Sequence, residues 1–367
     1  MVRLLPLLLI ALLCSCNRDQ NPGPEAPPQP GLQFTLLEDE LVGRPVVLIG
    51  DPTSDFYLSF FAELDGQPLQ LERISSGLPW VFADESGTRY DIWGLGQGGQ
   101  NDGRILEPVY SGRGFWMTFA GMFPGVSLNG SPQEDIELDL EFNPDWAIPV
   151  SSVISGAGLD VIQSLDDPTF EEYRSPSGSE EYFVRPDDWV VGVNINGDIR
   201  AYPHPILTSH EIVNDIVGGV PIAVTFCPLT NTARVYRRAS GNPEFGVSGF
   251  VWNSNMLMFD RTNELNLFNQ VTGNCVRGPR LGEQLEPLPY IRTSWNTWSR
   301  IYPRTQVLLP SPGLDLDEMR DFEKSFIEAV GPSLFPLDYI DPRNRLRKMV
   351  LCITDGVEAK VWDLESF

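Results

Sequence analysis

The feature that most constrains the fold of this chain is an internal duplication. Residues 44–61, RPVVLIGDPTSDFYLSFF, align without gaps on residues 220–237, VPIAVTFCPLTNTARVYR, at a separation of 176 positions. A second pair of segments, residues 106–124 and 285–303, aligns at a separation of 179 positions. Because matched hydrophobic spacing produces matched strands, the repeat predicts two structurally similar units.

Side chains with distinctive chemistry recur at equivalent positions of the two copies. The first alignment continues far enough to pair Asp84 with Asp260. The other matched pairs are Pro45 and Pro221, Asp51 and Cys227, Pro52 and Pro228, Phe60 and Tyr236, Glu107 and Glu286, Arg113 and Arg292, Trp116 and Trp295, and Pro124 and Pro303. We therefore expect the two tryptophans to occupy corresponding buried positions.

A third similarity links residues 188–203 to residues 348–363. Each has an apolar run, then Asn-Gly or Asp-Gly, then a second alternating run, which is the signal of a β-hairpin. This hairpin precedes the repeat in the second half but lies at the C-terminus for the first. We infer that the C-terminal hairpin completes the N-terminal lobe.

These patterns predict a β-rich α+β fold of two pseudo-repeated β lobes with a few short helices. One helix is expected at 205–213, and Thr293 or Ser294 can cap a helix that begins near Trp295. The aromatic spacing of that helix recurs after Trp116. Residues 316–330 form the clearest amphipathic pattern, with an apolar stripe that contains Met319, Phe322 and Phe326.

The first residues have the features of a bacterial export signal. Arg3 precedes an apolar run from Leu4 to Leu13, and that run is too short to span a bilayer. Leu13-Cys14-Ser15-Cys16 resembles a lipobox, whose last cysteine is acylated. We therefore expect an exported cell-envelope lipoprotein, held at the periplasmic face or the cell surface by a lipid anchor on Cys16. A plain secretory signal with incidental cysteines is the alternative.

A proline-rich polar stretch follows the signal and reads as a tether, because it cannot bury a core. Together with the duplication, it suggests five segments. They are a lipoprotein signal peptide (1–16), a tether (17–31), an N-terminal repeat lobe (32–150), a second lobe (151–310), and a helix with a C-terminal hairpin packed on the first lobe (311–367).

Charge and cysteine content limit the function classes. Asp plus Glu number 50 against 26 Lys plus Arg, so a nucleic-acid backbone would be repelled. The chain has two histidines, His204 and His210, which excludes a multi-histidine metal site within one chain. Cys227, Cys275 and Cys352 allow one disulfide and a leftover thiol, but their spacing selects no pair.

From about Gly158 to Leu308 the chain resembles a bacterial family catalogued only as domain-of-unknown-function 3179. The stretches that carry the resemblance are GLDVIQSLDDPTF, DWVVGVNINGDIRAYPHPIL, HEIVNDIVGGVPIAVTFCPLTNTA, FGVSGFVWNSNMLMFDR and LEPLPYIRTSWNTWSRIYP. The family has no settled activity, so the resemblance implies an architecture and candidate positions but no reaction.

Two departures from the family pattern affect the expected chemistry. Members read Cys-Pro-Leu-Cys where this chain has Thr230 as the fourth residue, and Leu-Trp-Ser-Gln where it has residues 267–270, LFNQ. A Cys-x-x-Cys pair suits redox chemistry or a soft metal because both thiolates share one turn. A hydroxyl at Thr230 cannot form a disulfide, which puts such a role in doubt here.

The remaining candidate site is a cluster of His210, Cys227, Asp260 and Gln270. One imidazole and one thiolate could begin a copper or zinc site, and the Asp260 or Gln270 oxygen could complete it. Asp215, Asp260 or Gln270 could hold the second imidazole nitrogen. Alternatively, Cys227 is a small buried apolar residue and His210 packs on its helix.

Two hypotheses follow. The first is a non-catalytic, envelope-anchored binding or scaffold lipoprotein. The second is a metal- or thiol-dependent periplasmic oxidoreductase that uses His210 and Cys227. Whether the chain is an enzyme stays open at this point, as do its ligand and its protein partners.

Overall fold

The computed structural model describes residues 34–74, 77–131, 136, 138, 143–174, 182–238, 243–356 and 358–367. The expected signal peptide with Cys16 and the expected tether lie outside these residues. None of the described helices has the length and apolar character that crossing a bilayer needs.

The first copy of the repeat contains two main antiparallel sheets. The sheet strands are β1 (Thr35–Leu41), β2 (Arg44–Asp51) and β3 (Phe56–Phe61) in one, and β6 (Leu71–Arg73), β7 (Trp80–Asp84), β8 (Arg89–Asp91) and β9 (Gly96–Gln97) in the other, with the small ribbon β4 (Glu63–Leu64) and β5 (Gln67–Pro68) between them. The copy ends with β10 (Ser111–Phe115), α1 (Trp116–Met122) and β11 (Ser127–Leu128).

The second copy repeats this order. It contains β16 (Ile212–Val217), β17 (Val220–Cys227) and β18 (Thr232–Arg237), then β19 (Phe245–Trp252), β20 (Asn255–Asp260), β21 (Leu267–Asn269) and β22 (Cys275–Arg277), and then β23 (Ile291–Ser294), α3 (Trp295–Ile301) and β24 (Gln306–Leu308). Two further strands, β12 (Val153–Ser155) and β13 (Phe170–Glu172), extend these sheets beside β19 and β24.

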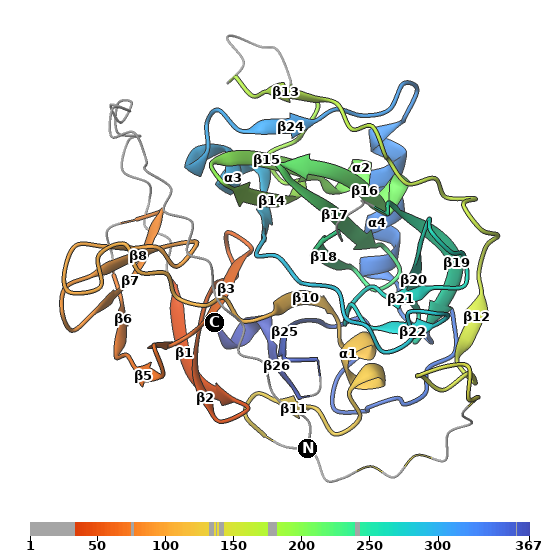
Figure 1. Cartoon of the computed structure of the whole chain (residues 1–367), viewed down its shortest axis with the longest axis horizontal. Helices are drawn as coiled ribbons and strands as arrows, with labels where there is room; N and C mark the ends of the chain where they lie inside the picture. Colours follow the sequence, from red (N-terminus) through yellow and green to blue (C-terminus); the bar gives the residue numbers. More distant parts are fainter. Residues whose placement is uncertain are drawn as a thin grey trace, which may run out of the picture.

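Each copy receives a hairpin from elsewhere in the sequence. In the second lobe, β14 (Trp189–Ile195) and β15 (Asp198–Pro203) pair with β23 and, in parallel, with β24. In the first lobe, β25 (Met349–Thr354) and β26 (Ala359–Asp363) pair with β10 and, in parallel, with β11. Figure 1 shows this C-terminal hairpin beside β10. The predicted β-rich α+β fold is therefore confirmed, and the C-terminal hairpin completes the first lobe.

Individual contacts repeat at the spacing of the duplication. The Phe61 amide donates to the Glu107 carbonyl at 2.9 Å, and the Arg237 amide donates to the Glu286 carbonyl at 2.9 Å. Trp116 and Trp295 are both buried, each as the first residue of its helix. The two copies thus share their registers as well as their strand order.

The helices fit the expectations in number but differ in detail. The helix expected at 205–213 is α2 (His204–His210), and it ends early because Glu211 takes a left-handed conformation, with φ of 57°. The expected amphipathic helix is α4 (Leu316–Glu328), followed at the C-terminus by the short 3-10 helix η1 (Leu364–Ser366).

The face of α4 that packs on the fold contains a charged residue within the expected apolar stripe. Glu323 is the buried residue of this helix, whereas Phe322 is 44% exposed. The reason is a polar contact, since the Glu323 carboxylate lies 2.9 Å from the His204 ring on α2. Figure 1 shows α4 alongside α2.

One of the hydrophobic core clusters spans both lobes. A single cluster includes Phe60 and Phe82 from the first lobe together with Trp298 and Val307 from the second. Trp93 also packs edge-on against Trp298, with ring centroids 6.4 Å apart. Side chains of both lobes therefore pack against each other where the lobes meet.

Candidate functional site

The four side chains expected to form a metal or thiol site occupy separate environments. Both ring nitrogens of His210 have partners, because Nδ1 lies 2.9 Å from the Gln163 carbonyl and Nε2 lies 2.9 Å from the Ser311 hydroxyl. Asp260 accepts from Asn266 and Arg280 through Oδ2. His210 and Asp260 therefore share no hydrogen-bond partner in these contacts.

Cys227 and Gln270 lie closer together, within a buried polar cluster. Cys227 is opposite Thr232 in the β17–β18 pair, and the Thr232 hydroxyl donates to Gln270 Oε1 at 2.8 Å. Asn255 donates to the same oxygen and to Thr230. Thr230 stands where family members have their second cysteine. Its hydroxyl group is part of a buried network of hydrogen bonds between uncharged side chains.

The Cys227 thiol is fully buried, and burial raises its pKa to about 12. Cys227, Cys275 and Cys352 are all free and buried. Among the residues that the structure describes, no group of three or more His, Cys, Asp and Glu side chains is placed to hold a metal ion. The copper or zinc site thus stays a prediction without a supporting geometry.

A different constellation lies where the lobes meet, at the two arginines that the duplication pairs. Arg113 on β10 and Arg292 on β23 are 3% and 5% exposed. Arg113 Nη2 donates to the Arg292 carbonyl at 3.3 Å. Both guanidinium groups also lie over the same ring, that of Trp189, at 5.6 and 4.5 Å from its centroid. The pseudo-symmetry therefore brings two positive charges to one place.

Each arginine contacts the turn of its own repeat. Arg113 donates to Asp55, and Arg292 donates to the side chain and carbonyl of Asn231. These turn residues occupy equivalent positions and share a left-handed backbone, with φ of 53° and 54°. Only the first copy supplies a carboxylate, so Arg292 is bound by a neutral amide.

Glu323 and His204 lie beyond Asn231. Asn231 donates to Glu323 Oε1 at 3.2 Å, and this oxygen lies 2.9 Å from His204 Nδ1. Burial lowers the pKa of His204 to about 4, so the ring is neutral at pH 7 and its Nδ1–H donates to the carboxylate. His204 Nε2 is then an acceptor, and it is buried without a hydrogen-bond partner among the described residues.

Positive charge exceeds negative charge in this region. A third buried arginine, Arg234, donates to the Tyr290 hydroxyl at 3.1 Å and to the Ser111 carbonyl at 3.3 Å. Its hydrogen bonds reach no carboxylate among the described residues, whereas Arg113 contacts Asp55. Burial, together with the nearby charge of Arg292, lowers the pKa of Arg113 well below its usual range. The guanidinium groups therefore repel one another.

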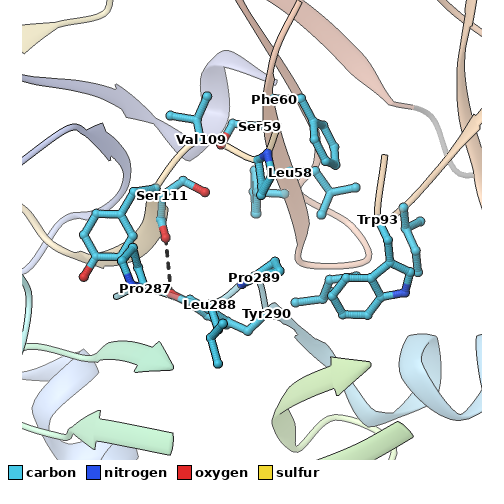
Figure 2. A pocket seen from close by; sticks show the side chains of 15 residues that line it. Leu58, Ser59, Phe60, Trp93, Val109, Ser111, Pro287, Leu288, Pro289 and Tyr290 are labelled. Carbon is cyan, nitrogen blue, oxygen red and sulfur yellow. Dashed lines mark hydrogen bonds between the residues drawn. The ribbon is translucent and has the colours of Figure 1, made fainter. Parts of the chain in front are cut away.

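An apolar cavity lies beside these charges. It has a volume of about 100 Å³ and lies between β3, the segment before β10 and the segment before β23. Figure 2 shows Leu58 and Phe60 on one side and Leu288 and Pro289 on the other. A smaller pocket of about 20 Å³, lined by Arg113 and Arg292, shares three lining residues with it, Tyr57, Ser111 and Tyr290. The apolar cavity and the small arginine-lined pocket are therefore neighbours that share part of their walls.

One protein family has a model that matches this chain. The model described as "Protein of unknown function (DUF3179)" matches residues 159–367, which is more than half of the chain. The chain belongs to this family. No curated protein and no solved structure matches it significantly.

The DUF3179 region contains Arg234, Arg292, His204 and Glu323, but the first lobe supplies Arg113. The internal alignment pairs Arg113 with Arg292, but this pairing alone does not indicate a site. The available signal was an arginine retained at equivalent positions of the two copies. Glu323 carried a different signal, because it lies within the apolar stripe of a predicted helix.

Proposed function

We propose that this protein is a non-catalytic binding protein for a small organic anion, held where its two lobes meet. The observation that carries the proposal is the pair of buried arginines, Arg113 and Arg292, that line a small pocket next to an apolar cavity. A buried cation without a matching anion is costly, and a bound anion removes that cost.

The chemistry of the site favours a carboxylate with a compact apolar body. A guanidinium group can bind a carboxylate through two parallel hydrogen bonds. Arg292 Nε is buried and has no hydrogen-bond partner among the described residues, so it has donor capacity left. The cavity walls, which include Leu58, Phe60 and Val109, suit an aromatic ring or a short alkyl chain. A monocarboxylate of the size of benzoate combines both features.

The oxidoreductase hypothesis has less support. It depends on His210 and Cys227, whose polar atoms are engaged or buried as described above. The position at the cell envelope, through a lipid on Cys16, belongs to the same proposal. Its support is the N-terminal sequence alone, because these residues lie outside the described part of the chain.

Isothermal titration calorimetry with benzoate tests the proposal. We expect saturable binding of benzoate and little binding of benzamide, which has the same shape without the charge. Replacing Arg292 by Gln should weaken benzoate binding about 10- to 100-fold, since a hydrogen bond to a charged group contributes roughly 1.5–3 kcal/mol. Leu288→Trp, which fills the cavity, should weaken it without altering any charge.

Arg261→Gln is the matched control. Arg261 forms an ion pair with Asp160 at 2.6 Å and does not line the cavity. Its loss should leave benzoate affinity unchanged. Equal binding of benzamide and benzoate, or unchanged affinity in folded Arg292→Gln, would contradict the proposal.

A further inference from the structure

A second pocket lies beside the C-terminal part of α2, with Thr208 and Glu211 in its wall. It has a volume of about 320 Å³, and its lining is almost entirely apolar, with side chains from β19, β20 and α4. Phe322 and Leu334 line it and are 44% and 64% exposed, so the pocket has an accessible mouth. A pocket of this size and polarity can enclose a small lipophilic molecule.

One carboxyl group faces this apolar space. Glu211 lines the pocket and is 6% exposed, and no hydrogen bond to its carboxyl group is formed by the described residues. The residue also holds a left-handed backbone, with φ of 57°, which is strained for a side chain of this size. Thr208, on the same wall, has a buried hydroxyl without a partner among the described residues. The Glu211 carboxyl group thus lacks a partner that a ligand in the pocket could supply.

We propose that this pocket binds an uncharged lipophilic molecule with a carbonyl or ether oxygen, and that the Glu211 carboxyl group donates a hydrogen bond to this oxygen. No basic side chain lines the pocket to receive an anion. A cation would form a buried ion pair with Glu211, and the cost of removing both charges from water would offset much of their attraction. A neutral hydrogen-bond acceptor requires neither a basic side chain nor a buried ion pair.

The protonation state of Glu211 is consistent with this role. Burial raises its pKa to about 8, so the carboxyl group is mostly protonated at pH 7. The neighbouring groups do not reverse this. On β17, Cys227 is a neutral thiol, and on α4, Glu323 is bonded to His204. His210 is bonded to Gln163 and Ser311, and the pocket residues from β19, β20 and the segment at 334–335 are not ionisable.

The fluorescent ketone prodan is a suitable probe, because it is uncharged and its emission reports hydrogen bonding at its carbonyl. We expect the wild-type protein to bind prodan at pH 6 and to lose up to about tenfold in affinity at pH 9, where most of Glu211 is ionised. Glu211→Gln keeps a donor that does not titrate, so its affinity should be the same at both pH values. Glu318→Gln, on the exposed side of α4, is the control and should behave as wild type.

Leu229→Trp, which narrows the pocket, should abolish prodan binding at either pH and leave benzoate affinity unchanged. This comparison separates the second site from the arginine site, on which it does not depend. Three results would overturn the proposal. They are no saturable prodan binding to wild type at pH 6, the same pH dependence in Glu211→Gln, or full prodan binding by Leu229→Trp.

Discussion

Asp55 and Asn231 show how one side chain distinguishes the two halves of the arginine site. They occupy equivalent turns and contact equivalent arginines, but only Asp55 carries a charge. The first copy is therefore partly neutralised from within. In the second copy Arg292 is hydrogen-bonded to a neutral amide, and the carboxylate that acts on it, Glu323, lies beyond that amide.

Asp55→Asn should strengthen benzoate binding by about tenfold. The change keeps the side-chain shape, and asparagine tolerates the left-handed conformation, while a carboxylate that competes with the ligand for Arg113 is removed. Calorimetry at pH 7 measures the difference. Asp65→Asn is a matched control, because Asp65 has a φ of 51° and an exposed ion pair with Arg104. Weaker binding by Asp55→Asn than by this control would contradict the assignment.

Glu211 should make the free energy of unfolding depend on pH. Its folded-state pKa is raised by burial to about 8, above the ordinary 4.5, so the folded protein holds a proton that the unfolded chain has released. Stability therefore falls as pH rises through this window. Relative to Glu211→Gln, the wild type should lose on the order of 3 kcal/mol between pH 5 and pH 8.

Urea unfolding of both proteins at several pH values measures this difference. His204 contributes in the opposite direction at lower pH, because its folded-state pKa is lowered from 6.5 to about 4 and stability rises between these values. The comparison with Glu211→Gln cancels that contribution. A constant difference between the two proteins from pH 5 to pH 8 would show that Glu211 does not titrate in this range.

At the scale of elements, the sequence predicted strands and helices well where a local rule governed them. Asn-Gly and Asp-Gly turns located both hairpins, and the aromatic spacing located α1 and α3. The burial of Glu323 on α4 could not be predicted in this way. It is set by the pairing of Glu323 with His204, which are 119 positions apart.

The site was less predictable than the fold for the same reason. His210 and Cys227 were predicted to form a site because of their residue types and because they are close in sequence. Arg113 and Arg292 belong to different lobes, and only the packing of the two copies brings them to one ring, that of Trp189. Local patterns hold little information on such long-range contacts.

The cap of α3 provides a test at this scale. The Ser294 hydroxyl accepts a hydrogen bond from the Thr297 amide at 3.3 Å, whereas α1 has no side-chain cap at the equivalent Phe115. Ser294→Ala should cost about 1 kcal/mol of unfolding free energy. Ser325→Ala, within exposed α4, should cost less because alanine favours helix interiors. Equal costs in thermal or urea unfolding would argue against a capping role.

At the scale of the whole molecule, the order of the chain differs from the order of the structural units. The first lobe is complete only when the last strands, β25 and β26, pair with β10 and β11. The DUF3179 match ends with these strands although they belong to the lobe that mostly precedes it. The chain therefore leaves the first lobe, forms the second lobe, and returns to the first lobe with its last strands. The two lobes also share a hydrophobic cluster.

Attachment to the cell envelope is expected to depend on one sulfur atom. Cys16→Ala should move the protein from the membrane fraction to the soluble fraction, because the acidic body offers no other affinity for lipid. Cys14→Ala is the control and should leave the protein with the membranes. Fractionation followed by immunoblotting measures both. The opposite result for the two cysteines would refute the lipobox assignment.

The central claim is that the buried arginines bind an organic anion, and a crystal structure with 4-bromobenzoate tests it most directly. Bromine gives an anomalous signal that locates the ring independently of the refined coordinates. We predict a bromine peak in the cavity near Leu58 and Phe60, with the carboxylate within hydrogen-bond distance of Arg113 or Arg292. A fully occupied bromine peak elsewhere, together with no density beside either arginine, would contradict the account.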